Sequence, residues 1–160
     1  MDASNSLKKN SLLKEIKKLY PSLSFAEGEL FRWDSELHCI YYDPESLDDP
    51  EGQYNLLHEL AHALLGHANY TYDVALVQME AEAWQRSHEL AAQFGLSVDP
   101  AYAEGALDTY RGWLSGRSMC PACAMTGVQQ TKNTYQCINC RCRWRVNDAK
   151  FCALRRFKVA

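Results

Sequence analysis

The residues of this chain whose types and spacing best suit chemistry form the segment His-Glu-Leu-Ala-His at positions 58–62. His58 and His62 are four residues apart, so on a helix they lie one turn apart on the same face. Two imidazoles placed in this way can bind one zinc ion, and Glu59 can then take a proton from a water that the metal activates. The segment therefore predicts two metal ligands and a general base, a set suited to hydrolysing a peptide bond.

A catalytic zinc site of this kind needs a third protein ligand. The extended pattern HExxHxxGxxH would require Gly at position 65 and His at position 68, but the chain has Leu65 and Ala68. His67 would point roughly opposite His58 on a continuing helix. We interpret His67 as a polar residue at the end of the helix, with direct metal binding as the alternative.

Glu80 is the predicted third ligand. It falls within a helix predicted over residues 74–94, and at 100° per residue it lies in the middle of the apolar face, while the other two glutamates of this helix lie on the opposite side. A buried carboxylate is costly unless it is paired, and a zinc ion would offset that cost. The alternative is a buried salt bridge, for example to Arg32 or Arg111.

The C-terminal part of the chain contains a second predicted metal site. Cys120 and Cys123 form one CxxC pair, and Cys137 and Cys140 form another, with 13 residues between the pairs. Such pairs in a chain without an evident export signal indicate metal ligands rather than disulfides. They resemble a zinc ribbon and predict one closed, structural zinc site, with Cys142 in place of Cys140 as an alternative.

Charge is distributed unevenly along the chain. Residues 1–131 hold 9 Lys/Arg and 19 Asp/Glu, whereas residues 132–160 hold 8 Lys/Arg and a single acid, Asp148. A basic segment with interleaved aromatic rings can bind nucleic acid, or it can dock on an acidic surface of its own chain or of another. The residues concerned are Lys132, Arg141, Arg143, Arg145, Lys150, Arg155, Arg156 and Lys158, with Tyr135, Trp144, Phe151 and Phe157.

Hydrophobic periodicity predicts an α+β fold of about four helices against a small, mainly antiparallel sheet, followed by the ribbon. The helices are expected at residues 6–20, closed by Pro21, from Pro50 to about Leu65, at 74–94 and from Pro100 to about Leu114. The strands lie between Leu23 and Asp43, and residues 34–36 could form a hairpin loop between two of them. The last strand, residues 37–42 with His38, would lie beside the cleft and could pair with an extended peptide. Residues 115–118 suggest a linker. The predicted domains are 1–117, zincin-like, and 118–160, a four-cysteine zinc ribbon with a basic tail.

Hydropathy gives no indication of a membrane protein. No apolar run approaches the roughly 20 residues that a spanning helix needs. The first twenty residues contain lysines but no apolar core and no small-residue cleavage site, so we expect no signal peptide and a cytoplasmic location.

A family resemblance rests on these motifs. The segment HELAHALLGH, followed about twenty residues later by a helix with Glu-x-x-Ala, resembles the ImmA/IrrE metallo-endopeptidases, a branch of the zincins whose third ligand is Glu. Over residues 80–87 the family commonly has E-x-E-A-N-x-F-A, and here Trp84 replaces the usual Asn or Asp. The resemblance covers residues 37–95. It implies helices against a small sheet, zinc bound by His58, His62 and Glu80, and intracellular proteolysis with Glu59 as base, often of a DNA-binding regulator. A second family, the SprT-like proteases, is similar only in joining HExxH to a zinc ribbon.

Together these features predict a zinc-dependent endopeptidase that acts on a protein or peptide, with one catalytic and one structural Zn2+. A non-catalytic adaptor or nucleic-acid-binding module is the alternative from another functional class. A SprT-like protease that acts on DNA-bound proteins is a further alternative.

Overall fold

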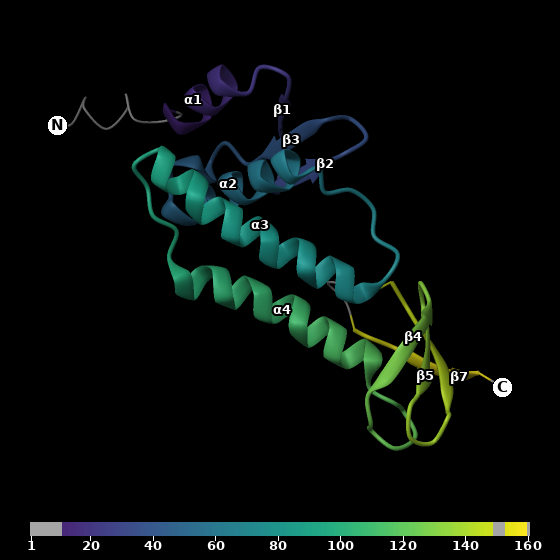
Figure 1. Ribbon diagram of the computed structural model, residues 1–160. Coiled ribbons are helices and arrows are strands. Elements are labelled where there is room, and N and C mark those ends of the chain that lie inside the picture. The colour runs from purple at the N-terminus through teal and green to yellow at the C-terminus, as the bar shows by residue number, and fades with distance from the viewer. Residues whose placement is uncertain (1–10, 149–152, 160) are drawn as a thin grey trace. The chain divides into compact units, whose positions relative to one another are not determined.

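The computed structural model describes residues 11–148 and 153–159 (Figure 1). Contacts between Cα atoms divide the chain into two compact units. The first unit runs up to Ala68 and includes Ala81–Ala103. The second unit contains Asn69–Glu80 and everything from Glu104 onward. The α+β class is confirmed, and the part of the chain that is described contains four α-helices, as expected. A boundary between folding domains after residue 117 stays a prediction, because these units are defined by contacts alone.

The first unit contains a three-stranded sheet. Strands β2 and β3 form the predicted antiparallel hairpin, and the Asp34 carboxylate accepts the turn N–H groups of Glu36 and Leu37. Strand β1 pairs with β3 in parallel, so the strand order is β1-β3-β2. His38, expected in a strand, lies in the hairpin turn with a φ of 49°. The strands are Ser24–Glu27 (β1), Arg32–Asp34 (β2) and Cys39–Tyr42 (β3).

The position of β3 overturns one expectation. The sequence suggested that residues 37–42 would form a strand open to an extended peptide, but β3 is the central strand and both of its sides are paired. The open edge nearest the metal motif is β2, since helix α2 (Pro50–Leu65), which carries the motif, contacts both β2 and β3. A peptide that adds to this sheet must therefore pair with β2.

Helix α1 (Ser11–Leu19) is amphipathic, as predicted, and buries Leu13 and Ile16 while its lysines remain exposed. The predicted start of this helix, residues 6–10, lies outside the described residues. Pro21, two residues beyond the helix, agrees with the predicted stop.

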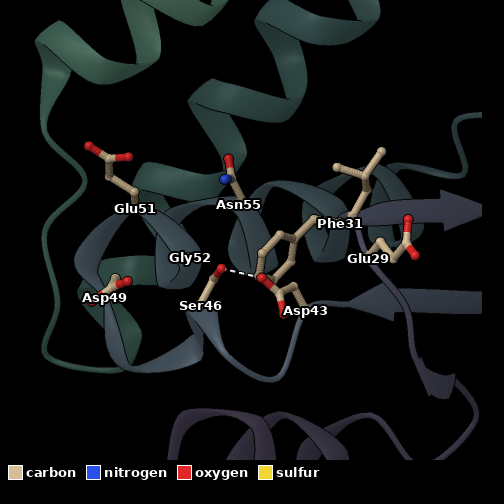
Figure 2. A pocket seen from close by; sticks show the side chains of 9 residues that line it. Glu29, Phe31, Asp43, Ser46, Asp49, Glu51, Gly52 and Asn55 are labelled. Atoms are coloured by element: carbon tan, nitrogen blue, oxygen red, sulfur yellow. Dashed lines mark hydrogen bonds between the residues drawn. The ribbon is translucent and has the colours of Figure 1, made fainter.

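Helix α2 (Pro50–Leu65) carries the HExxH motif and has the predicted ends. Pro50 is its first residue, and Gly66 ends it in the left-handed region at φ 68°, where a side chain would be strained. Its start packs against the 3-10 helix η1 (Ser46–Asp48): a Cβ on Gly52 would lie 1.9 Å from the carbonyl oxygen of Ser46. A cavity of about 250 Å3 lies in this region. Its lining residues (Figure 2) are Glu29, Leu30, Phe31, Asp43, Ser46, Asp49, Glu51, Gly52 and Asn55.

Two further helices follow. Helix α3 (Asp73–Gln93) buries the face predicted from its periodicity; the buried side chains include Leu76, Glu80, Ala83, Trp84, Ser87 and Ala91. Helix α4 (Pro100–Ser118) is longer than predicted. Residues 115–118 are helical, so the linker expected there is wrong. Among the described residues, no helix is long and apolar enough to cross a membrane.

The second unit contains an antiparallel sheet of order β4-β5-β6-β7. Its core is formed mainly by Tyr135, Trp144 and Val146, with two of the cysteines, Cys120 and Cys137. Tyr135 and Trp144 are cross-strand neighbours whose rings stack with centroids 5.7 Å apart. The strands are Gly127–Thr131 (β4), Thr134–Cys137 (β5), Arg143–Val146 (β6) and Arg156–Val159 (β7).

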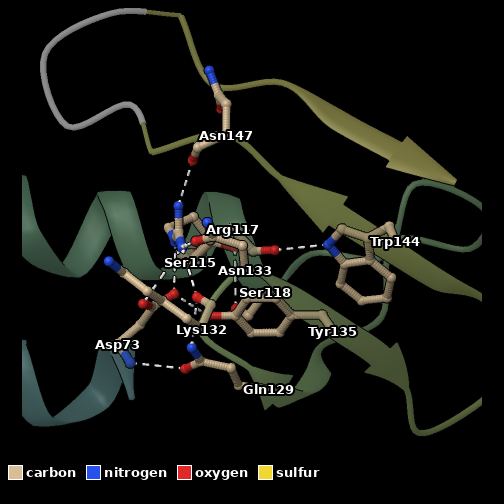
Figure 3. A network of polar contacts seen from close by, with 10 residues as sticks. All are labelled: Asp73, Ser115, Arg117, Ser118, Gln129, Lys132, Asn133, Tyr135, Trp144 and Asn147. Atoms are coloured by element: carbon tan, nitrogen blue, oxygen red, sulfur yellow. Dashed lines mark hydrogen bonds and ion pairs between the residues drawn. The ribbon is translucent and has the colours of Figure 1, made fainter. Parts of the chain in front are cut away.

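A buried polar network holds the second unit together (Figure 3). The Arg117 guanidinium donates to Asp73 over 2.6 Å, and both side chains are fully buried. The Tyr135 hydroxyl donates to the same carboxylate, and Trp144 donates its indole N–H to the Arg117 carbonyl. Because a buried charge is tolerated only when it is paired, this network explains why α4 continues through Arg117.

Candidate metal centres

Helix α2 presents both histidines of the motif on one face. The Nε2 atoms of His58 and His62 are 3.0 Å apart, and both side chains are buried. Two nitrogens about 2.0–2.1 Å from one tetrahedral zinc would lie about 3.3 Å from each other, close to this separation. The ring positions therefore fit two imidazoles that share one ion through Nε2.

Glu80 comes to this pair from helix α3. Trp84 stacks on the His58 ring with centroids 4.2 Å apart, and Glu80 precedes Trp84 by one helical turn on the same face. The ligand atoms of His58, His62 and Glu80 all lie within 4.8 Å of one another. Two imidazoles and one carboxylate, all buried, form a donor set that suits zinc with a fourth position left for solvent or substrate.

The alternatives weighed for Glu80 find other partners. Arg32 pairs with Asp34, and Arg111 pairs with Glu104 and Asp108. The partners found for both arginines are thus carboxylates other than Glu80.

His67 has a role that the sequence did not reveal. Its Nδ1 lies 2.9 Å from Nδ1 of His62, and its Nε2 lies 3.3 Å from the Glu82 carboxylate. If Nε2 of His62 binds a metal, its Nδ1–H donates to His67, whose Nε2–H donates to Glu82. The wheel that placed His67 opposite His58 assumed a continuing helix, but Gly66 turns the chain back.

Glu59 is held by the edge strand of the sheet. Its Oε2 accepts the backbone N–H of Trp33 over 2.6 Å. The Trp33 indole N–H also donates to the carbonyl of His67 over 2.9 Å. One residue of β2 thus contacts both the predicted base and the turn that follows the motif, a connection that only tertiary structure reveals.

A series of aromatic contacts within the first unit begins at His58. Trp84 lies against Tyr102, whose ring contacts Tyr54 and whose hydroxyl donates to Asn55. Trp84 occupies the position where the resembling family has Asn or Asp, and its buried indole N–H has no hydrogen-bond partner among the described residues. Trp84 therefore supports the motif by packing on His58 rather than through a polar contact.

The four predicted cysteine ligands form the second cluster. The Sγ atoms of Cys120 and Cys140 are 3.6 Å apart, and those of Cys123 and Cys137 are 3.5 Å apart. All four fall within one group of potential ligand atoms, and Cys142, the alternative to Cys140, lies outside that group.

The two CxxC turns repeat the same backbone geometry. The N–H of Cys120 bonds to the carbonyl of Met125, and that of Cys137 bonds to the carbonyl of Cys142, each five residues on. The residue after each pair, Ala124 or Arg141, has a φ near 60°. The two turns thus share one hydrogen bond and one backbone conformation, as expected of two turns that present their thiols to the same metal ion.

The thiol pKa values respond to this packing. Burial opposes ionisation of Cys120, but the backbone N–H groups of Ala122 and Cys123 lower its pKa to about 6. The backbone N–H of Cys142 favours ionised Cys140, yet the Cys123 thiol and burial raise the pKa of Cys140 to about 12. Cys140 therefore holds its proton tightly among its neighbouring thiols, and a divalent cation would displace that proton.

Comparison with known proteins agrees with this geometry. Neither the curated proteins nor the solved structures gave a match to the chain. A peptidase M78 family model, described as the IrrE N-terminal-like domain, matches residues 15–97. The matched region, just over half of the 160 residues, contains the sheet, the HExxH helix and Glu80. The chain therefore belongs to the peptidase M78 family, a family of metallopeptidase type, through an IrrE N-terminal-like domain.

Proposed function

We propose that the protein is a zinc-dependent endopeptidase. The observation that carries this proposal is the buried convergence of His58, His62 and Glu80, with Glu59 beside the two histidines on the same helix. A buried carboxylate next to two buried imidazoles is costly without a cation. Membership of a metallopeptidase-type family supports the same assignment.

In this proposal Glu59 moves the proton. Zinc, when bound, would supply Lewis-acid polarisation of the scissile carbonyl and a lowered pKa for water. A carboxylate has several lone pairs, so Glu59 can keep the Trp33 N–H on Oε2 and still accept a proton from water. Glu59 then passes that proton to the leaving amine nitrogen of the peptide.

Strand β2 offers a place for the substrate. It is an edge strand, and the Trp33 N–H points away from β3 toward Glu59. An extended peptide that adds to this edge would gain main-chain hydrogen bonds close to the predicted base. We propose a protein segment in extended conformation as substrate, with a cytoplasmic DNA-binding regulator as the candidate that the family resemblance implies.

The four cysteines take a structural role in this proposal. Cys120, Cys123, Cys137 and Cys140 would fill all positions of a tetrahedral zinc and leave none for substrate. The small core beneath them contains few large side chains, so the metal would supply much of the stability of this sheet.

Glu59→Gln tests the proposal. The amide retains the size of the side chain but cannot take the proton, so we expect zinc content to stay at the wild-type level. Cleavage of a peptide library, followed by mass spectrometry, should fall at least about 100-fold. Glu51→Gln, an exposed glutamate on the same helix, is the matched control and should cleave normally. Equal cleavage by E59Q and wild type would refute Glu59 as the base.

A further inference from the structure

The ribbon region carries an unbalanced positive charge. Described residues 119–148 and 153–159 contain a single acid, Asp148, and seven basic residues. A surface so unbalanced attracts polyanions. The basic residues are Lys132, Arg141, Arg143, Arg145, Arg155, Arg156 and Lys158.

Two of these cations share one face of the sheet with an aromatic ring. Strand β6 alternates, so that Trp144 and Val146 enter the core while Arg143 and Arg145 are exposed. Phe157 on β7 lies directly opposite Arg145. Directly paired residues point to the same side of a sheet. We call this side the outer face; by register it consists of Val128, Thr131, Thr134, Gln136, Arg143, Arg145, Phe157 and Val159.

The outer face is not explained by packing within the second unit. The core of the ribbon lies on the other side of the sheet, and Phe157 remains 44% exposed. The Arg145 guanidinium lies 5.5 Å from the centroid of the Phe157 ring. Among the described residues, neither Arg143 nor Arg145 forms an ion pair.

Other cations of the same unit do have structural partners, and this contrast is informative. Arg117 is buried against Asp73, and Arg156 donates to the carbonyl of Met119. Arg143 and Arg145 are instead presented to solvent two residues apart on one strand, about 6.6–6.8 Å along its axis.

We propose that the outer face binds single-stranded nucleic acid. Arg143 and Arg145 would contact successive phosphates, while a base stacks on Phe157 or on the neighbouring guanidinium plane. An acidic protein segment would pair with the two arginines but would gain little from the exposed Phe157 ring. A duplex keeps the faces of its bases stacked inside, so they are not available to stack on Phe157. This activity is independent of the proposed peptidase site, and it would place the protease near nucleic acid.

Fluorescence anisotropy of a labelled oligo-dT of about 12 nucleotides tests the proposal with the full-length, zinc-loaded protein. The R143Q/R145Q variant should bind at least about tenfold more weakly, and the log–log slope against salt should become shallower by about 1.4. Phe157→Ser should weaken binding about tenfold and leave that slope unchanged. K14Q/K18Q is the matched control, because it removes the same charge from exposed positions on α1.

Three results would overturn the proposal. The first is no binding at about 50 mM salt, where phosphate contacts are strong. The second is an equal loss in K14Q/K18Q and R143Q/R145Q, which would show a net-charge effect. The third is that polyglutamate competes as well as unlabelled oligo-dT does, while F157S binds oligo-dT as tightly as the wild type. That result would favour an acidic protein as the partner. The zinc content of each variant verifies that it is folded. If the double variant loses zinc, R143Q and R145Q are measured as single variants, and each should weaken binding about threefold.

Discussion

The backbone N–H of Trp33 donates to Glu59 Oε2 over 2.6 Å and so joins edge strand β2 to the glutamate of the HExxH motif. A general base must be held in one orientation to act on a neighbouring water. The same residue fixes the chain after the motif through its indole N–H and the His67 carbonyl. The two contacts of Trp33 can be separated by mutation.

Trp33→Pro removes the backbone N–H and should lower the cleavage rate at least about tenfold, because the Glu59 carboxylate loses its fixed donor. Proline is tolerated on edge strands, so the sheet should survive. Trp33→Phe keeps the N–H and loses only the indole donor, and its cleavage rate should stay within about threefold of wild type. Equal rates for the two variants, at equal zinc content, would show that the N–H does not orient the base.

His67→Ala should weaken zinc binding at the histidine site about 10- to 100-fold, because partners of metal-bound imidazoles orient the ring and raise its basicity. Glu82→Gln should act in the same direction but less strongly, since Glu82 is largely exposed. Competition with a chromogenic chelator measures the affinity. Glu89→Gln, on the exposed side of the same helix, serves as control. An unchanged affinity in H67A would remove His67 from this role.

Arg117→Met should destabilise the protein by about 3–5 kcal/mol, because it leaves Asp73 charged, buried and without its cationic partner. Arg111→Gln is the comparison on the same helix. Arg111 is half exposed beside Glu104 and Asp108, so its loss should lower the stability far less than the loss of Arg117. Urea denaturation measures both variants. Similar losses would mean that the Arg117 pair contributes no more than a surface pair.

Tyr135→Phe probes the same network through pH. Burial, and then the hydrogen bond to Asp73, raise the pKa of Tyr135 above its usual value. The folded state therefore favours the neutral phenol, and this contribution is fully present below about pH 10, where the unfolded tyrosine ionises. It is lost as pH rises further. The variant should be less stable than wild type near pH 8, by about 1–3 kcal/mol. That difference in urea midpoint should shrink by pH 11, whereas a constant difference would contradict the assignment.

Local signals in the sequence predicted much of what positions the site. Pro50 and Gly66 bound the motif helix as expected, because their backbone restrictions act within a few residues. The helical wheel placed Glu80 on a buried face, and Glu80 is 6% exposed. The CxxC spacing brought together the same four cysteines that the structure clusters.

Features that depend on distant residues were missed. The parallel pairing of β1 with β3 joins segments whose register nothing local determines. The glycines and serines near residue 116 suggested a linker, but the buried Arg117 network overrides their weak helix propensity. Trp33 reaches Glu59 across 26 residues of sequence, and His67 reaches His62 only because the chain reverses at Gly66.

The zinc content of the full-length protein tests the central claim most directly. After dialysis against a mild chelator, atomic emission should find two zinc ions per chain in the wild type and in the E89Q control, since the four-cysteine site and the site of His58, His62 and Glu80 both retain metal. Glu80→Gln should reduce the count to one, because it removes the anionic ligand and leaves the cysteines intact. Equal zinc content in E80Q and wild type would contradict the account.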